Sequence, residues 1–271
     1  MARNLVLGLP TVGQLGDRWW VGAGSTWLAR FSQSILIAMM ARLMQGLSAR
    51  LPSQCLVCHA WPAQAVCEAC VGQFAQPWPR CRTCAIPVVP GIDQCGTCIR
   101  QRPPLDACFA AVSYAYPWSG LVLNFKFRAQ PGLAATLALL LRSAPWVEPA
   151  LDSADIVLPI PLSRQRLMTR GFNQAMLLAK QLAPEKSDSG LLLRLRESPA
   201  QRTLGRAERL ISLTGAFAVE PLAAERIRGS RVVLVDDVMT SGGTLFAAAQ
   251  TVRQAGAAHI TGLVIARTPN D

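Results

Sequence analysis

The chain has 271 residues, of which 51% are hydrophobic and 16% are charged. This balance is typical of a folded protein and excludes a largely disordered chain. The formal net charge of +11 predicts an anionic partner: phosphate groups, nucleic acid or an acidic membrane surface. Residues 158–209 alone carry ten basic and four acidic residues. A solvated basic face would explain this concentration as well as a binding site would.

The first 50 residues show no secretory signal, and the apolar run Ile35–Ala41 is far shorter than the roughly 20 residues that span a bilayer. Residues 1–25 contain five glycines without a regular period, which indicates a disordered tail or residues upstream of the natural start. From Trp27 to Leu51, apolar residues recur every three to four positions, which predicts an amphipathic helix. We expect a cytoplasmic protein without a membrane span.

Residues 51–105 are rich in cysteine and proline and lack long apolar runs, so this segment needs a bound metal in order to fold. Four CxxC pairs favour metal over disulfides or an iron–sulfur cluster, and two pairs complete one tetrahedral site. Consecutive pairing closes shorter loops, although an interleaved arrangement fits the same spacing. Two structural Zn²⁺ sites are therefore predicted. Their ligands are Cys55, Cys58, Cys67, Cys70, Cys81, Cys84, Cys95 and Cys98.

From residue 106 onward, strand-like and helix-like runs alternate. Strands are predicted at residues 108–116, 155–161, 231–237 and 259–268. Helices are predicted at residues 118–128, 133–142, 173–182 and 243–255. This alternation indicates an α/β fold in which helices cover both faces of a parallel sheet. The ninth cysteine, Cys108, lies in the first strand and is expected to be a small buried apolar residue.

The stretch RVVLVDDVMTSGGT, residues 231–244, predicts a pocket for a ribose 5-phosphate. Asp236 and Asp237 stand at the carboxyl end of an apolar strand, where open α/β sheets bind their ligands. Their carboxylates suit the vicinal hydroxyls of a ribose, directly or through Mg²⁺. A glycine-rich turn before a helix offers backbone N–H groups, hydroxyls and the helix dipole to a phosphate. The alternative is an ordinary strand–turn–helix with capping Ser and Thr. The turn residues are Thr240, Ser241, Gly242, Gly243 and Thr244.

This stretch resembles the phosphoribosyl pyrophosphate (PRPP) motif of type I phosphoribosyltransferases. Residues 159–179 (PIPLSRQRLMTRGFNQAMLLA) resemble the PVPL…R…RGFNQ signature of the competence protein ComF family, which includes the GntX-type proteins. Residues 201–217 resemble another tract of that family, with Ser212 in place of the family's Asn. The four CxxC pairs and the NFKF element around Lys126 match as well, so the resemblance covers about residues 51–268.

Three segments are therefore expected. Residues 1–50, outside the resemblance, are the tail and amphipathic helix. The resemblance implies a double zinc ribbon at residues 51–105 and a type I phosphoribosyltransferase-like domain, a parallel sheet flanked by helices, at residues 106–271. In that domain Asp236 and Asp237 would be the catalytic residues that hold the ribose, and the turn from Thr240 to Thr244 would hold the 5-phosphate. The remaining PRPP contacts would come from Leu162, Ser163, Arg164, Arg170 and Lys126.

The implied reaction is displacement at C1 of the ribose, in which pyrophosphate leaves and Mg²⁺ neutralises the departing charge. No base-recognition hood is evident, so PRPP binding without transfer is an alternative. The family's theme is uptake and handling of transforming DNA. The chain is therefore expected to assist natural transformation, as a transferase, as a single-stranded DNA-binding module with a regulatory PRPP pocket, or as an adaptor. An adaptor would dock its zinc ribbons on a competence helicase or another DNA-processing protein.

Overall fold

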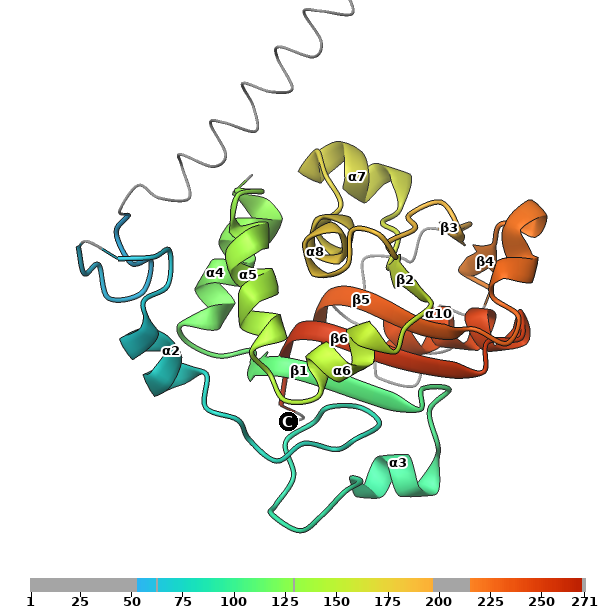
Figure 1. The fold of residues 1–271 in the computed structure, drawn as a ribbon, viewed down its shortest axis with the longest axis horizontal. Coiled ribbons are helices and arrows are strands. Elements are labelled where there is room, and N and C mark those ends of the chain that lie inside the picture. Colours follow the sequence, from blue (N-terminus) through green and yellow to red (C-terminus); the bar gives the residue numbers. More distant parts are fainter. Residues whose placement is uncertain (1–52, 62, 129, 197–214, 270–271) are drawn as a thin grey trace, which may run out of the picture. The chain divides into compact units, whose positions relative to one another are not determined.

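Four parallel strands form the central sheet of the computed structural model, in the order β1-β6-β5-β2 (Figure 1). The structure describes residues 53–61, 63–128, 130–196 and 215–269. The predicted tail and helix of residues 1–50 therefore lie outside the described residues. The strands are β1 (Ala107–Ser113), β2 (Ile156–Pro159), β5 (Arg231–Met239) and β6 (His259–Arg267). The predicted α/β fold with a parallel sheet is confirmed.

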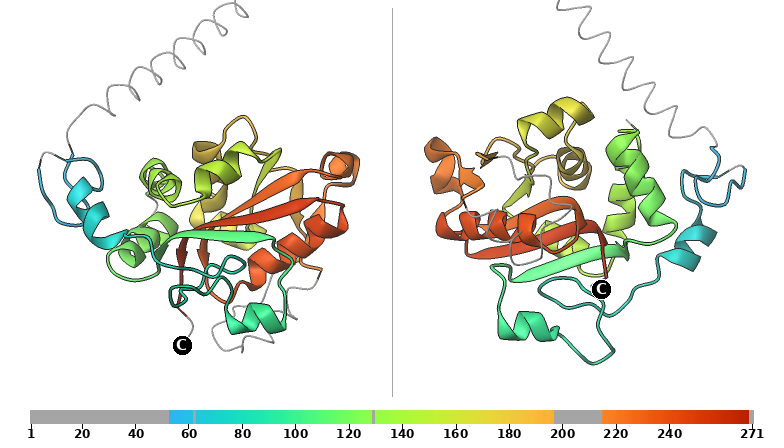
Figure 2. Two further views of the ribbon diagram at one scale, coloured as in Figure 1. Left: turned by 60° about the horizontal axis from the view of Figure 1, so that its bottom comes forward. Right: turned by 180° about the vertical axis from the view of Figure 1, so that it is seen from behind.

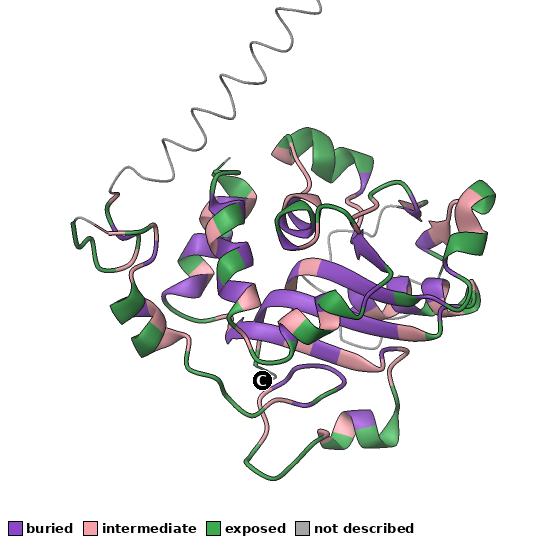
Figure 3. Cartoon of the chain, in the orientation of Figure 1, coloured by how far each residue is buried: buried purple, intermediate pink, exposed green. Residues whose placement is uncertain are grey.

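The two central strands, β5 and β6, owe their place to long apolar runs. Val232 to Val235 are all buried, as are the residues of β6 after its first position (Figure 3). Strands that are covered on both faces lose the usual alternation of polar and apolar residues, because every side chain meets the core. Because β2 pairs with β5 in parallel, the carboxyl ends of these two strands lie side by side at the same edge of the sheet.

Helices cover both faces of the sheet (Figure 2). On one face lie α4 (Trp118–Phe127), α5 (Leu133–Arg142), α6 (Val147–Asp152) and α8 (Gln174–Leu182). On the other face α10 (Gly243–Gln254) packs through Leu245, Ala248 and Val252. The four predicted helices are confirmed, and among the described residues the structure adds α6 and α7 (Arg164–Arg170), which have no long apolar pattern.

A short antiparallel pair, β3 (Leu192–Arg194) and β4 (Phe217–Val219), follows α8, and the 3₁₀ helix η1 (Pro221–Arg226) leads into β5. Ahead of the sheet, the cysteine-rich segment contributes two short helices, α2 (Glu68–Phe74) and α3 (Gly96–Arg100). Each starts directly after a cysteine, Cys67 or Cys95. No helix in the described part of the chain is both long and apolar enough to cross a membrane.

Candidate functional site

The acid pair of the predicted ribose site lies where β5 extends beyond the end of β2. The register pairs Pro159, the last residue of β2, with Val235, so the next residues of β5 have no partner on that side. Asp237 is buried and Asp236 is half-buried. The backbone N–H of Asp237 donates to Asp236 Oδ1 at 2.8 Å. The strand continues to Met239, two residues further than predicted, because it still pairs with β6.

Two cations from distant parts of the chain face this acid pair. Lys126, near the end of α4, places its Nζ 2.9 Å from Asp237 Oδ1. Arg170 ends α7, and its guanidinium lies 5.0 Å from the ring centroid of Phe127. Burial lowers the pKa of Arg170, against the attraction of the charges on Asp237 and Asp236. The structure thus brings together four of the predicted site residues from three separate elements.

Burial and the charge of Asp237 raise the pKa of Asp236 to about 7, although Lys126 opposes the shift. A carboxyl group that titrates near neutral pH can exchange its proton for a cation or a hydroxyl donor at little cost. Such a shift is frequent at functional sites, because the arrangement that binds a ligand is unfavourable in its absence.

The predicted phosphate turn follows β5 directly. Gly242 has φ +84°, and a Cβ there would lie 2.6 Å from Met239 Cε and 2.7 Å from the Phe246 ring. Only glycine fits this position. The turn and the first residues of α10 line a small hollow of ≈ 40 Å³ that also touches Asp236. Thr240 is exposed, whereas Ser241 and Thr244 are half-buried. The first turn of α10 carries no acidic residue, which favours an anion at its positive end, and the Gly243 N–H donates to Ser241 Oγ at 3.4 Å.

In the second predicted loop, between β2 and α7, the Ser163 hydroxyl already takes part in a hydrogen bond within the protein. Ser163 is buried and its Oγ accepts from the backbone N–H of Arg166 at 3.4 Å, which caps α7. Leu162 is half-buried, and Arg164 lies on the exposed side of α7. The loop can therefore offer backbone groups to an anion, and Arg170, at the end of α7, lies close enough to Asp237 and Asp236 to interact with their charges.

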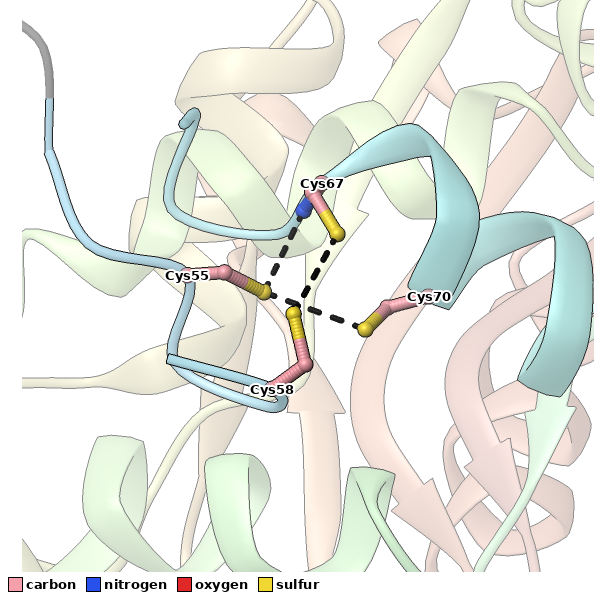
Figure 4. Close-up of side chains that lie close together, drawn as sticks. All are labelled: Cys55, Cys58, Cys67 and Cys70. Atoms are coloured by element: carbon pink, nitrogen blue, oxygen red, sulfur yellow. Dashed lines mark hydrogen bonds between the residues drawn. The ribbon is translucent and has the colours of Figure 1, made fainter. Parts of the chain in front are cut away.

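The eight paired cysteines form two four-sulfur clusters, one of which is drawn in Figure 4. Cys55, Cys58, Cys67 and Cys70 make the first cluster, and Cys81, Cys84, Cys95 and Cys98 make the second. Consecutive pairing is therefore confirmed over the interleaved alternative. In the first cluster the sulfur–sulfur distances are 3.9 Å for Cys55–Cys70 and 3.6 Å for Cys58–Cys67.

These spacings fit a tetrahedral zinc ion. Four thiolates at a Zn–S distance of about 2.3 Å lie about 3.8 Å from one another, and in the second cluster Cys84 and Cys95 are 3.7 Å apart. Hydrogen bonding between the side chains of Cys81 and Cys84 lowers the pKa of Cys81 to about 4 and raises the pKa of Cys84. One thiolate is thus favoured even before a cation binds. A four-cysteine donor set leaves no open position for a catalytic water.

The two clusters differ in their surroundings. In the first, Cys58 is exposed and the buried Cys55 and Cys70 pack with Trp118 of α4. In the second, three of the four cysteines are buried in the core on the side of α10, together with Met239 and Leu245. The second cluster is therefore continuous with the core beneath the phosphate turn.

Comparison with known proteins gives consistent matches. The DNA utilization protein YhgH of Salmonella typhimurium is 30% identical over 227 residues, which cover 80% of this chain and 98% of that protein. Competence protein F of Haemophilus influenzae is 32% identical over 203 residues, covering 72% of this chain and 87% of that protein. Residues 167–271 match the phosphoribosyl transferase domain family.

The chain belongs to the ComF family. Competence protein ComFC of Bacillus subtilis, another ComF protein, is 36% identical over 118 residues, which cover 43% of this chain and 46% of that protein. Among solved structures, the allosteric regulatory enzyme of purine biosynthesis aligns with 50% of this chain and 25% of its own, at 23% identity and a TM-score of 0.31. That similarity is too low to add to the assignment of the site.

The ComF signature RGFNQ has a structural explanation here that the sequence did not reveal. Its Asn173 donates through Nδ2 to the carbonyl of Ile160 at 3.0 Å and caps α8 by accepting from Met176 N. The buried Gln174 accepts from Arg170 Nη1 at 3.1 Å and donates to the Lys126 carbonyl at 3.5 Å. Both side chains are taken up in fixing the loop and the two cations.

Proposed function

We propose that this ComF protein binds PRPP at the carboxyl ends of β2 and β5. One observation carries the proposal: an acid pair, a glycine turn and a helix N-terminus lie in direct succession, and Lys126 and Arg170 face the acids. This is the arrangement that a sugar with a phosphate at one end and a pyrophosphate at the other requires. The match to the phosphoribosyl transferase domain over residues 167–271 supports it.

Each residue then has a defined task. Asp236 and Asp237 hold the ribose hydroxyls, and the turn from Thr240 to Thr244 holds the 5-phosphate through hydroxyls and backbone N–H groups. The backbone at Leu162 and Ser163, with Arg170 and Lys126, holds the pyrophosphate. Arg164 would reach it only from the exposed side of α7. Mg²⁺, held by the carboxylates, would neutralise the pyrophosphate.

In this arrangement Lys126 has two roles. Without ligand it neutralises Asp237, which would otherwise be a buried unpaired charge. Mg²⁺ held by the carboxylates would supply the charge that neutralises Asp237, and the Lys126 ammonium would then be free to contact the pyrophosphate oxygens. Transfer needs only that pyrophosphate leaves C1 while an acceptor attacks, so positioning and electrostatics would supply the catalysis.

We further propose that both cysteine clusters hold structural Zn²⁺ and that the protein assists DNA uptake in natural transformation. The spacing of the sulfur atoms supports the metal. The names of two relatives, competence protein F and DNA utilization protein YhgH, support the process. A cytoplasmic location is consistent with reduced cysteines. Docking of the zinc ribbons on a competence helicase or another DNA-processing protein remains part of this proposal.

Calorimetric titration of PRPP with Mg²⁺ tests the binding site. We expect the wild-type protein to bind and the Asp236→Ala/Asp237→Ala double variant to bind at least tenfold more weakly, because the ribose and cation contacts are lost. Asp152→Ala, which removes an exposed carboxylate on α6, is the matched control and should bind like wild type. Equal affinity in the double variant would refute the site. Release of pyrophosphate with candidate bases then separates transfer from binding alone.

Single-stranded DNA binding is a second candidate function, in which the PRPP pocket regulates rather than catalyses. The specific observation is the surface of α7, where no residue is buried and Arg164 and Arg166 are exposed. Beside it the ring of Phe127 is 64% exposed. Basic side chains next to an exposed aromatic ring suit the phosphates and bases of a single strand. A cavity of ≈ 290 Å³ there is lined by Lys126, Phe127, Gln165, Arg166, Thr169 and Arg170.

A further inference from the structure

A fully buried arginine joins the second cysteine cluster to the phosphate turn. Arg267, the last residue of β6, is 0% exposed and lies in register with Met239 on β5 and Ser113 on β1. Its Nε donates to the carbonyl of Cys84 at 2.9 Å. Its Nη1 donates to the carbonyls of Met239, at 3.2 Å, and of Thr240. One side chain thus holds both a metal-binding turn and the first residues of the phosphate turn.

The metal-binding turn, defined here as residues 81–85, is fixed against the end of the sheet. The N–H of Cys108, on the edge strand β1, donates to the Arg82 carbonyl at 2.7 Å. A second arginine, Arg80, donates from Nη1 to the Ala85 carbonyl and from Nη2 to Ser113 Oγ, both at 3.1 Å. The turn itself is tight, because Ala85 has a φ of +56°. Its closed shape brings the Cys84 carbonyl to Arg267.

A buried guanidinium is tolerated only while acceptors surround it. Cys84 supplies a sulfur to the metal site and a carbonyl to Arg267. If the metal is lost, the turn opens, the carbonyl moves away, and the arginine must seek other acceptors or water. Its other partners include the Met239 and Thr240 carbonyls, where β5 passes into the phosphate turn, and the carbonyl and Oγ1 of Thr268. The backbone at the start of the phosphate turn would therefore shift with it.

The first cluster has different contacts. Its cysteines belong to the half of the core formed with α4 and α5, and Trp118 Nε1 donates to the carbonyl of Phe74 at the end of α2, at 2.9 Å. The second cluster shares its half of the core with Met239, Leu245 and Ala248, which lie under the phosphate turn and along α10. The two clusters therefore stabilise different parts of the same domain.

We propose that Arg267 is a positioning residue that couples metal binding at Cys81, Cys84, Cys95 and Cys98 to the shape of the phosphate turn. The second cluster would then be a built-in part of the PRPP site, and the first cluster would not. This inference rests on the proposed zinc and PRPP binding. It predicts that loss of metal from one particular cluster disables the turn while the rest of the sheet stays folded.

Hydrogen exchange of the full chain, without PRPP, tests the coupling directly. Three amides report on the turn: Phe246 N–H bonds to the Gly242 carbonyl at 2.8 Å, Thr268 N–H to the Met239 carbonyl at 3.1 Å, and Val238 N–H to Asp237 Oδ1 at 2.6 Å. Two amides on the far side of the sheet serve as the reference, Val157 N–H to the Lys186 carbonyl and Asp188 N–H to the Val157 carbonyl. Zinc per chain is measured on every sample.

The variants are Arg267→Lys, Cys84→Ser and the matched Cys58→Ser. Lysine keeps the charge but cannot donate to Cys84, Met239 and Thr240 together. We expect Arg267→Lys to keep two zinc ions per chain yet speed exchange of the three reporter amides at least tenfold. Cys84→Ser should do the same with one zinc ion lost. Cys58→Ser should lose one zinc ion and leave the reporters at the wild-type rate. The reference amides should not change.

The proposal is overturned if the reporters of zinc-loaded Arg267→Lys exchange as in wild type, or if Cys58→Ser and Cys84→Ser speed them equally. If Arg267→Lys does not fold, graded removal of zinc from the wild-type protein with a chelator tests the proposal instead. Exchange of the reporter amides must then follow the loss of the zinc ion from the second cluster and not the loss of the ion from the first. PRPP titration into the folded variants is a separate reading. If the reporter amides respond to metal loss but the wild-type protein does not bind PRPP, the coupling is supported and only the proposed ligand is refuted.

Discussion

At the scale of single residues, Asp236 combines a cost in stability with its proposed role in PRPP binding. Burial and the neighbouring charge of Asp237 raise its pKa to about 7, so the ionised form is unfavourable in the folded protein. An unfolded chain would ionise the same carboxyl near pH 4. Between these two values the folded protein holds its proton more tightly than the unfolded chain. The free energy of unfolding therefore falls as pH rises through this window.

Asp236→Asn removes that titration and keeps an oxygen that can accept from the Asp237 N–H. We expect the variant to match wild type near pH 4 and to exceed it in free energy of unfolding by about 2 kcal/mol at pH 8. This is about half of what the full pKa shift would give, because the side chain is partly solvated. Urea unfolding at both pH values measures the difference. The exposed control Asp152→Asn should show none, and a gain that is the same at both pH values would contradict the assignment.

At the scale of elements, the junction of α7 and α8 decides where the two cations lie. Gly171 ends α7 with a φ of +79°, and the chain turns at once into α8. Gln174, 1% exposed, then accepts from Arg170 and donates to the carbonyl of Lys126. A single amide thus orients the end of α7 and the end of α4 toward β5. The arginine is held between this amide and the ring of Phe127.

Gln174→Met keeps the length of the side chain but removes both hydrogen bonds. We expect a loss of about 1–3 kcal/mol in the free energy of unfolding, because buried polar groups on Arg170 and Lys126 lose their partner. PRPP affinity should fall as well, while Gln174→Glu, which still accepts from Arg170, should retain more of it. Urea unfolding and calorimetry measure the two effects. Gln181→Met changes an exposed glutamine on the same helix and should alter neither. Unchanged PRPP affinity in Gln174→Met would show that the amide does not position the cations.

At the scale of the whole molecule, the excess of positive charge raises the question of whether DNA contacts are general or local. The net charge is +11, and some exposed arginines pair with neighbouring acids, as Arg226 does with Asp188 and Arg228 with Glu225. Arg164 and Arg166 on α7 are exposed as well, and they differ from these arginines in lying near the exposed Phe127. A local site there predicts a defined number of phosphate contacts.

Binding of a single-stranded oligonucleotide, measured by fluorescence anisotropy at several salt concentrations, tests this. Three phosphate contacts predict a slope of about −2 for the logarithm of the binding constant against the logarithm of salt concentration. Arg166→Ala should make the slope shallower by about 0.7. Phe127→Ala should weaken binding about tenfold and leave the slope unchanged. Arg228→Ala removes an exposed arginine that follows η1 in the chain, and serves as a control. Equal weakening by Arg228→Ala would indicate diffuse attraction instead of a site on α7.

Short-range signals in the sequence were sufficient for much of this protein. The CxxC spacing predicted the metal ligands because both sulfurs of a pair come from one tight turn. The run from Arg231 to Thr244 predicted strand, acids, turn and helix because all of them depend on neighbouring residues. The same locality explains what was missed: α7 has no buried residue, so it has no apolar pattern to recognise.

Contacts between residues far apart in the sequence were decided only by the tertiary structure. Nothing local to Lys126 indicates that its ammonium meets Asp237, or that Gln174 holds its backbone. An arginine at the end of a strand, such as Arg267 at the end of β6, would be expected to lie in solvent. It is buried instead, and the metal-binding turn of residues 81–85 supplies it with the Cys84 carbonyl as an acceptor. The sequence determined which chemical groups are present and which turns present them. Packing decided which groups meet, because burial of a charge depends on the partners that the whole fold brings to it.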